Sequence, residues 1–185
     1  GSVCNSNTFG SSCGYNTFGN GCSRNTFGSN CFENTFGNGS SSNTFGSYVS
    51  RNMFGINCSY NTFMSYCWYN SFGTGCTNNT FSSGCTSNTF GSSCSSNTFG
   101  SSCRYNKFGD NCHSNTFGSD CATNTLGNDF SFIFAKKIAT KNISNISELK
   151  GKSYTNTIEL MSTGEYCYWH KTGTSSTDIT TVIIP

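Results

Sequence analysis

The sequence predicts an all-β fold: a β-solenoid, or parallel β-helix, followed by a small C-terminal β cap. Three observations predict it. A nine-residue unit recurs without insertion or deletion, its apolar positions recur with it, and charged residues make up only 10% of the chain. A short fixed period is typical of solenoids, in which each unit buries its apolar side chains only by stacking on its neighbours. We therefore expect residues 1–127 to form the solenoid and residues 128–185 to form the cap or a head.

Each repeat unit reads x-x-Asn-Thr-Phe-Gly-x-x-Cys. Asn stands at every ninth position from Asn7 to Asn124, and the apolar position runs from Phe9 to Phe117 and then Leu126. Thr and Phe favour strands, whereas Gly and Asn favour the bends between them. Because side chains alternate along a strand, Phe and Asn are predicted to face inward and Thr outward. The Asn column is predicted to form a ladder of side-chain amides.

The size of one coil follows from two irregularities in the repeat. A coil made of a single unit would be too tight to enclose Phe and Cys, so two or three units per coil are the feasible choices. Cys fills the ninth position except at Ser40 and Val49, which lie in consecutive units, and bulky residues such as Tyr15, Tyr69 and Tyr105 fall in alternate units. Both patterns favour two units per coil, giving about seven coils and a rod about 34 Å long at roughly 4.8 Å per coil.

The cysteines of the repeat are predicted to be mostly free, buried thiols that act as small hydrophobic residues. Stacked cysteines would have Cβ atoms about 4.8 Å apart, whereas a disulfide needs about 3.5–4.5 Å, so some disulfides are the alternative. Cys167 lies outside the repeat, and His113 and His170 are isolated. Zinc-type Cys pairs and the regular Asp of calcium-binding rolls are both missing, so neither a metal nor another cofactor is predicted.

Composition and motifs argue against several functional classes. The net charge of +2 gives no electrostatic reason to bind nucleic acid, and no apolar run is long enough to cross a membrane. The sequence has no nucleophile–base motif or phosphate loop, and the acidic residues of the repeat, Glu33, Asp110 and Asp120, are not placed as a catalytic pair. We therefore predict that the chain is not an enzyme.

The C-terminal segment is predicted to contain short strands. Phe130–Phe134 and Asp178–Ile184 are expected strands, and Tyr154–Leu160 is expected to pair with Tyr166–Trp169 as a hairpin. A solenoid end needs protection against pairing with other chains, so this segment is interpreted first as a cap.

The alternative interpretation is a head that binds a host glycan or protein. Its candidate binding residues are Tyr166, Tyr168, Trp169 and His170, a polar–aromatic cluster of which at most half can share one face of a strand.

The repeated string from Asn88 to Gly100, which reads NTFGSSCSSNTFG, resembles Asn-Thr-Phe-Gly repeat tracts in tail-associated proteins of gut bacteriophages and Bacteroides-like bacteria. The resemblance covers residues 4–127. It implies a non-enzymatic structural shaft and attachment module of a phage tail fibre, located in the virion tail. The implied partners are other tail-fibre components and a glycan or protein of the host-cell surface.

Two alternatives remain open. The first is an adhesin, secreted by a bacterium or held on its surface. The second is an ice-binding solenoid, to which the outward Thr column is similar, although the position that would hold a second Thr column varies.

Overall fold

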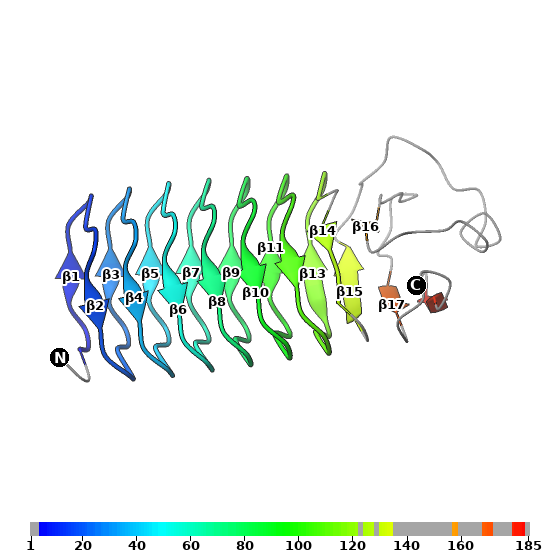
Figure 1. The fold of residues 1–185 in the computed structure, drawn as a ribbon. Coiled ribbons are helices and arrows are strands. Elements are labelled where there is room, and N and C mark those ends of the chain that lie inside the picture. Colours follow the sequence, from blue (N-terminus) through cyan, green and yellow to red (C-terminus); the bar gives the residue numbers. More distant parts are fainter. Residues whose placement is uncertain are drawn as a thin grey trace.

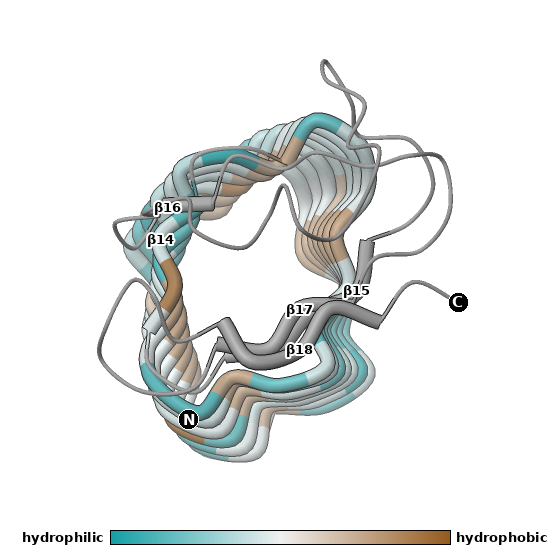
Figure 2. Tube along the Cα trace, turned by 90° about the vertical axis from the view of Figure 1, so that its right-hand side faces the viewer, coloured by the Kyte–Doolittle hydropathy of each residue, from teal (hydrophilic) through white to brown (hydrophobic). Residues whose placement is uncertain are grey.

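The protein is an all-β rod of stacked coils (Figure 1). The computed structural model describes residues 4–121, 124–127, 130–134, 157–158, 168–171 and 179–183, with side chains for residues 4–121 and 124–127. Viewed along its axis, successive coils overlay one another (Figure 2). The described residues form two sheets and no helix, which confirms the predicted β-solenoid.

Strands from alternate repeat units belong to different sheets. The first sheet contains, in order, β1 (Thr8–Phe9), β3 (Thr26–Phe27), β5 (Thr44–Phe45), β7 (Thr62–Phe63), β9 (Thr80–Phe81), β11 (Thr98–Phe99), β13 (Asn115–Phe117), β15 (Phe130–Phe134), β17 (Tyr168–Lys171) and β18 (Ile179–Ile183). The second sheet contains β2 (Thr17–Phe18), β4 (Thr35–Phe36), β6 (Met53–Phe54), β8 (Ser71–Phe72), β10 (Thr89–Phe90), β12 (Lys107–Phe108), β14 (Asn124–Thr125) and β16 (Thr157–Ile158).

The register of the parallel strands sets the length of one coil. Phe63 pairs with Phe81, and Phe81 pairs with Phe99, so each position meets the equivalent position two repeat units later. This confirms two units per coil. Ser40 and Val49 consequently belong to the same coil, and both are fully buried where the other coils have two cysteines.

The interior is a regular array of phenylalanine rings. Phe81 stacks on Phe63 and Phe99 in its own column, with ring centroids 4.8 and 4.9 Å apart and planes within 5° of parallel. It meets Phe72 and Phe90 of the opposite column edge to face, at 5.4 and 5.3 Å. Offset-stacked and edge-to-face contacts are the two favoured arrangements of aromatic pairs. The two Phe columns therefore form one continuous core, as the inward assignment of Phe predicts.

The inward asparagines form hydrogen bonds with one another along the rod. The Asn79 side chain accepts from the backbone N–H of Asn61 at 2.9 Å and from its Nδ2 at 3.1 Å. Its own Nδ2 donates to the Oδ1 of Asn97 and to the carbonyl of Cys58, both at 3.1 Å. Buried polar groups must be paired in this way. Because Asn has two acceptor and two donor positions in one short amide, it fits the site, and the predicted ladder is confirmed.

Two corners join the sheets in every coil. We call the link from the first sheet to the second the first corner (residues 10–16 and the equivalent positions of later coils). The return link is the second corner (residues 19–25 and their equivalents). The first corner places two residues per coil in the left-handed backbone region, such as Ser12 and Tyr15 with φ of 61° and 59°. This conformation is uncommon for residues other than Gly, Asn and Asp, so the choice of residue at these positions carries information.

The parallel stack continues beyond the last regular repeat and then changes direction. β15 pairs in parallel with β13, although Thr116 meets Ile133, whereas the regular step between coils would bring Phe134 to that place. β17 then pairs antiparallel with β15 and with β18, and β16 pairs antiparallel with β14. The expected strands Phe130–Phe134 and Asp178–Ile184 are confirmed as β15 and β18.

The expected hairpin between Tyr154–Leu160 and Tyr166–Trp169 is wrong. Its described parts, β16 and β17, lie in different sheets and pair with strands of the rod. Local alternation and a turn signal predict the hairpin, but each strand instead extends an existing sheet edge, which offers more backbone partners.

Candidate functional site

The C-terminal cluster predicted from the sequence falls mainly on β17. Tyr166 lies outside the described residues, whereas Tyr168, Trp169 and His170 are consecutive positions of β17. Trp169 pairs with Phe132 of β15 and with Val182 of β18, so the backbone of this strand is bonded on both edges. The cluster therefore belongs to the sheet that extends the rod, and its role in binding stays a prediction.

The acidic residues of the repeat are separated. Asp110 follows β12 in the second corner, and Asp120 follows β13 in the first corner. They therefore lie on opposite sides of the rod, and Glu33 lies several coils away. In the described part of the chain, no three His, Cys, Asp or Glu residues form a group that could hold a metal ion. The described residues also contain no helix with the length and hydropathy of a membrane span.

The twelve cysteines of the repeat are free thiols, and all but Cys4 and Cys13 are buried. They stack in two columns beside the phenylalanines. The Sγ of Cys76 donates to the carbonyl of Gly55 in the preceding coil at 3.3 Å, which satisfies the thiol. Burial raises the pKa of Cys31, and hydrogen bonding to Cys85 together with burial raises the pKa of Cys67. Cys31 and Cys67 are therefore held as protonated thiols inside the rod.

The two outer faces of the rod differ, and the nine-residue period does not predict this difference because it describes all repeats as one series. The first sheet has an unbroken outward column of seven threonines: Thr8, Thr26, Thr44, Thr62, Thr80, Thr98 and Thr116. In the second sheet the same column is interrupted by Met53, Ser71 and Lys107. Of the two described faces, the first sheet alone therefore presents a uniform row of hydroxyl and methyl groups at the strand spacing.

A cluster of exposed aromatic residues lies on the first corner. We call Tyr48, Tyr66, Trp68 and Tyr69 the aromatic ridge. Tyr48 and Tyr66 stack with ring centroids 5.5 Å apart and planes 12° from parallel, and Tyr48 meets Trp68 edge to face at 6.1 Å. The tyrosines of the ridge are about half exposed, and Trp68 is half-buried.

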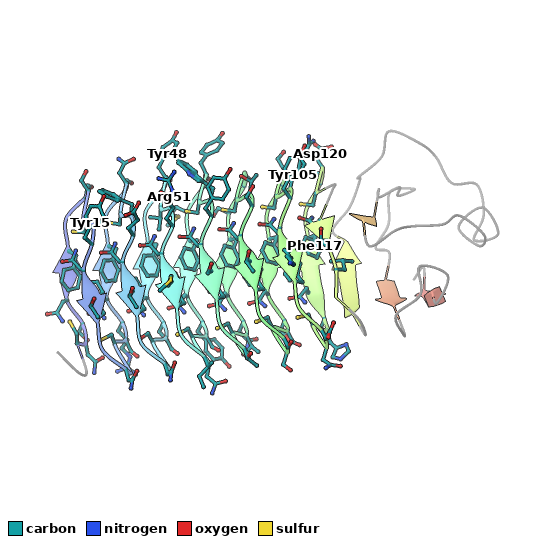
Figure 3. All side chains as sticks on the ribbon, in the orientation of Figure 1. Tyr15, Tyr48, Arg51, Tyr105, Phe117 and Asp120 are labelled. Carbon is teal, nitrogen blue, oxygen red and sulfur yellow. The ribbon has the colours of Figure 1, made fainter. Side chains whose placement is uncertain are left out.

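The ridge belongs to a longer row of side chains. Figure 3 shows Tyr15, Tyr48, Arg51 and Tyr105 along the same edge of the rod, whereas Phe117 lies inside it. The sequence signal for this row was the bulky residue in alternate units. This signal indicates the number of units per coil, but it does not by itself show that the bulky side chains gather on one surface.

No protein family, curated protein or solved structure matches the chain. The fold is therefore established by its own strand register.

Proposed function

We propose that this chain is a non-enzymatic rigid rod that holds an attachment element away from the structure on which it is mounted. The supporting observation is the uniformity of the core. The Phe columns and Asn ladders run through successive coils in one register, so each coil adds the same contacts and the same rise. In a core built this way, the number of coils sets the length of the rod, and the continuous contacts between coils make the rod stiff.

The repeat's resemblance to tail-associated phage proteins makes a tail-fibre shaft our leading assignment. Its C-terminal segment would then contact a glycan or protein of the host surface. A bacterial adhesin would use the same rod in the same mechanical role. The genes beside the coding sequence separate these assignments, since a tail fibre is expected among tail and baseplate genes.

The rod function is tested by changing the number of coils. Duplicating residues 76–93, which make up one coil, should lengthen the full chain by about 4.8 Å, measured as the maximum dimension in small-angle X-ray scattering. Labelled full-length chain should also bind whole bacterial cells, and the lengthened chain should bind equally well. A compact particle that does not lengthen would refute the spacer, and no binding to any bacterial strain would refute the attachment role.

One observation favours ice binding as a second candidate. The unbroken Thr column of the first sheet presents identical side chains at a fixed spacing, whereas the second sheet does not. Thermal hysteresis of the full chain tests this candidate. Replacing Thr62 and Thr80 with Lys should abolish the activity, and the matched control on the second sheet is Thr89→Lys, which should not.

A further inference from the structure

The aromatic ridge is built where the fold disfavours aromatic residues. Tyr48 and Tyr66 occupy a left-handed position, with φ of 62° and 60°. The equivalent residues of the other coils are Ser12, Asn30, Gly84, Ser102 and Asp120. These are small residues or residues that bond locally to the backbone, whereas tyrosine does neither. Every coil has this conformation at its corners, so the φ value itself does not mark a site; the two tyrosines stand out because no other described residue at their corner position is aromatic.

Three of the four rings of the ridge, those of Tyr48, Tyr66 and Trp68, pack on one another. Tyr48 is held between the stacked ring of Tyr66 and the edge of Trp68. The ring of Tyr66 lies over Gly84 of the next coil. A Cβ added at Gly84 would be only 2.7 Å from Cδ1 of Tyr66, so glycine leaves the room that this ring occupies. Rigid aromatic side chains provide contact area at a low entropic penalty. The ridge is therefore a preformed platform, with Tyr48 and Tyr66 each about half exposed.

The charges and hydroxyls around the ridge indicate the chemistry of the partner. Arg51 is the one charged residue of the first corner in the two coils that carry the ridge, and Glu33 lies one coil before it. Ser47 and Ser65 immediately precede the two stacked tyrosines and are partly exposed. A surface of aromatic rings flanked by hydroxyls, with little net charge, fits an uncharged ligand that has apolar faces and a polar rim. The pyranose rings of a neutral polysaccharide have this character.

The shape of the ridge favours a polysaccharide over a protein. The ridge spans two coils, about 10 Å along the axis, on a corner of the rod rather than on a sheet face. A stable protein interface needs about 800 Å² from each partner, which a narrow convex corner does not offer. A linear sugar chain needs only a row of aromatic contacts, and Tyr15 and Tyr105 lie on the same edge of the rod, two coils before and two coils after the ridge (Figure 3).

We propose that the aromatic ridge binds a neutral polysaccharide along the flank of the rod, with sugar rings stacking on Tyr48, Tyr66 and Trp68. This site is separate from the C-terminal segment, so it stands whether or not that segment binds a host surface. It would give a rod of this kind lateral contact with a cell-surface or matrix glycan.

The test uses the full chain in native affinity electrophoresis, in gels containing soluble polysaccharides of glucose, mannose or galactose, with polygalacturonate as the acidic comparison. At least one neutral polysaccharide should retard the protein. Tyr66→Ser should weaken that retention about tenfold or more, because truncating a central aromatic contact removes much of the binding energy. Serine occupies the same corner position at Ser12 and Ser102, so the fold should persist, and circular dichroism checks this.

The matched control is Tyr60→Ser. Tyr60 is also a strongly exposed tyrosine in the left-handed region, with φ of 59°, but it lies on the second corner. Retention should be unchanged in this variant. The proposal is overturned if no neutral polysaccharide retards the protein, if only the acidic one does, or if Tyr60→Ser and Tyr66→Ser lose retention equally. If the full chain is retarded by a neutral polysaccharide but does not bind whole bacterial cells, the proposed role of the C-terminal segment is overturned instead.

Discussion

Replacing Asn79 with Ala should be among the most destabilising single changes in the rod. The substitution removes the acceptor of two bonds from Asn61, and it removes the donor to the Cys58 carbonyl. Asn97 Oδ1 keeps its bond from the backbone N–H of residue 79. The backbone N–H of Asn61 and the Cys58 carbonyl are therefore left unpaired, and Asn61 Nδ2 keeps only its bond to the Ser40 carbonyl, so at about 1–3 kcal/mol for each unpaired group we expect a loss of at least about 2 kcal/mol.

The measurement is urea unfolding followed by circular dichroism. Thr80→Ala is the matched control, because Thr80 is the exposed neighbour of Asn79 and its loss should cost under about 0.5 kcal/mol. If the two variants unfold at the same urea concentration, the amide ladder does not stabilise the rod and the reasoning is refuted.

Asn79→Asp probes the same ladder with pH. The carboxylate keeps an acceptor for Asn61 but loses both donors and carries a charge in the interior. Burial should raise the pKa of the new carboxyl above its usual value of about 3.9, since it disfavours the charged form. A group with a raised folded-state pKa contributes its full stability below the unfolded pKa and loses it as pH rises. The free energy of unfolding of the variant should therefore be closer to that of the parent protein at pH 4 than at pH 7. A smaller difference at pH 7 than at pH 4 would contradict a buried position for residue 79.

Three further predictions concern the core, the coil and the thiols. Phe99→Ala should cost about 3–5 kcal/mol in urea unfolding, and Thr98→Ala well under about 1 kcal/mol; equal losses would invalidate the inward and outward assignments. Deleting residues 76–93, one whole coil, should give a folded, shorter rod, whereas deleting residues 76–84, half a coil, should exchange the two sheets downstream and impair folding; equal circular dichroism and stability would argue against two units per coil. Most cysteines of the repeat should resist a thiol reagent until the chain is denatured, and, because burial raises the pKa of Cys31, the stability that this thiol contributes should be lost as pH rises above the usual thiol value of about 8.5. Rapid labelling of the native protein would show that the thiol columns are accessible.

The repeat region could be predicted from the sequence because its structure is encoded locally and many times over. The strict position of Phe and Asn predicts which side chains are buried, and the joint loss of Cys at Ser40 and Val49 predicts the coil length. In a solenoid every long-range contact is a contact between equivalent positions, so the period determines the strand register.

The C-terminal pairing could not be predicted in the same way. Alternation over Tyr154–Leu160 indicates a strand but not its partner, and the two strands that resembled a hairpin joined different sheets. The candidate surface was missed for another reason. Tyr48 and Trp68 belong to different repeat units, and they become neighbours only once the coil length is known and the residues are placed on one corner.

The coil that contains Ser40 and Val49 has a consequence for how the chain finds its register. Coils with the same core could align one coil out of step during folding and still match Phe with Phe and Asn with Asn. Such a slip would be nearly equal in energy to the correct alignment and would trap the chain. The coil in which Ser40 and Val49 replace both cysteines differs in its core from the coils on either side, so a slip that displaces this coil changes the core contacts, whereas a slip between two cysteine coils does not. The coil that contains Ser40 and Val49 thus gives the folding chain one position at which the correct register differs from a slipped one.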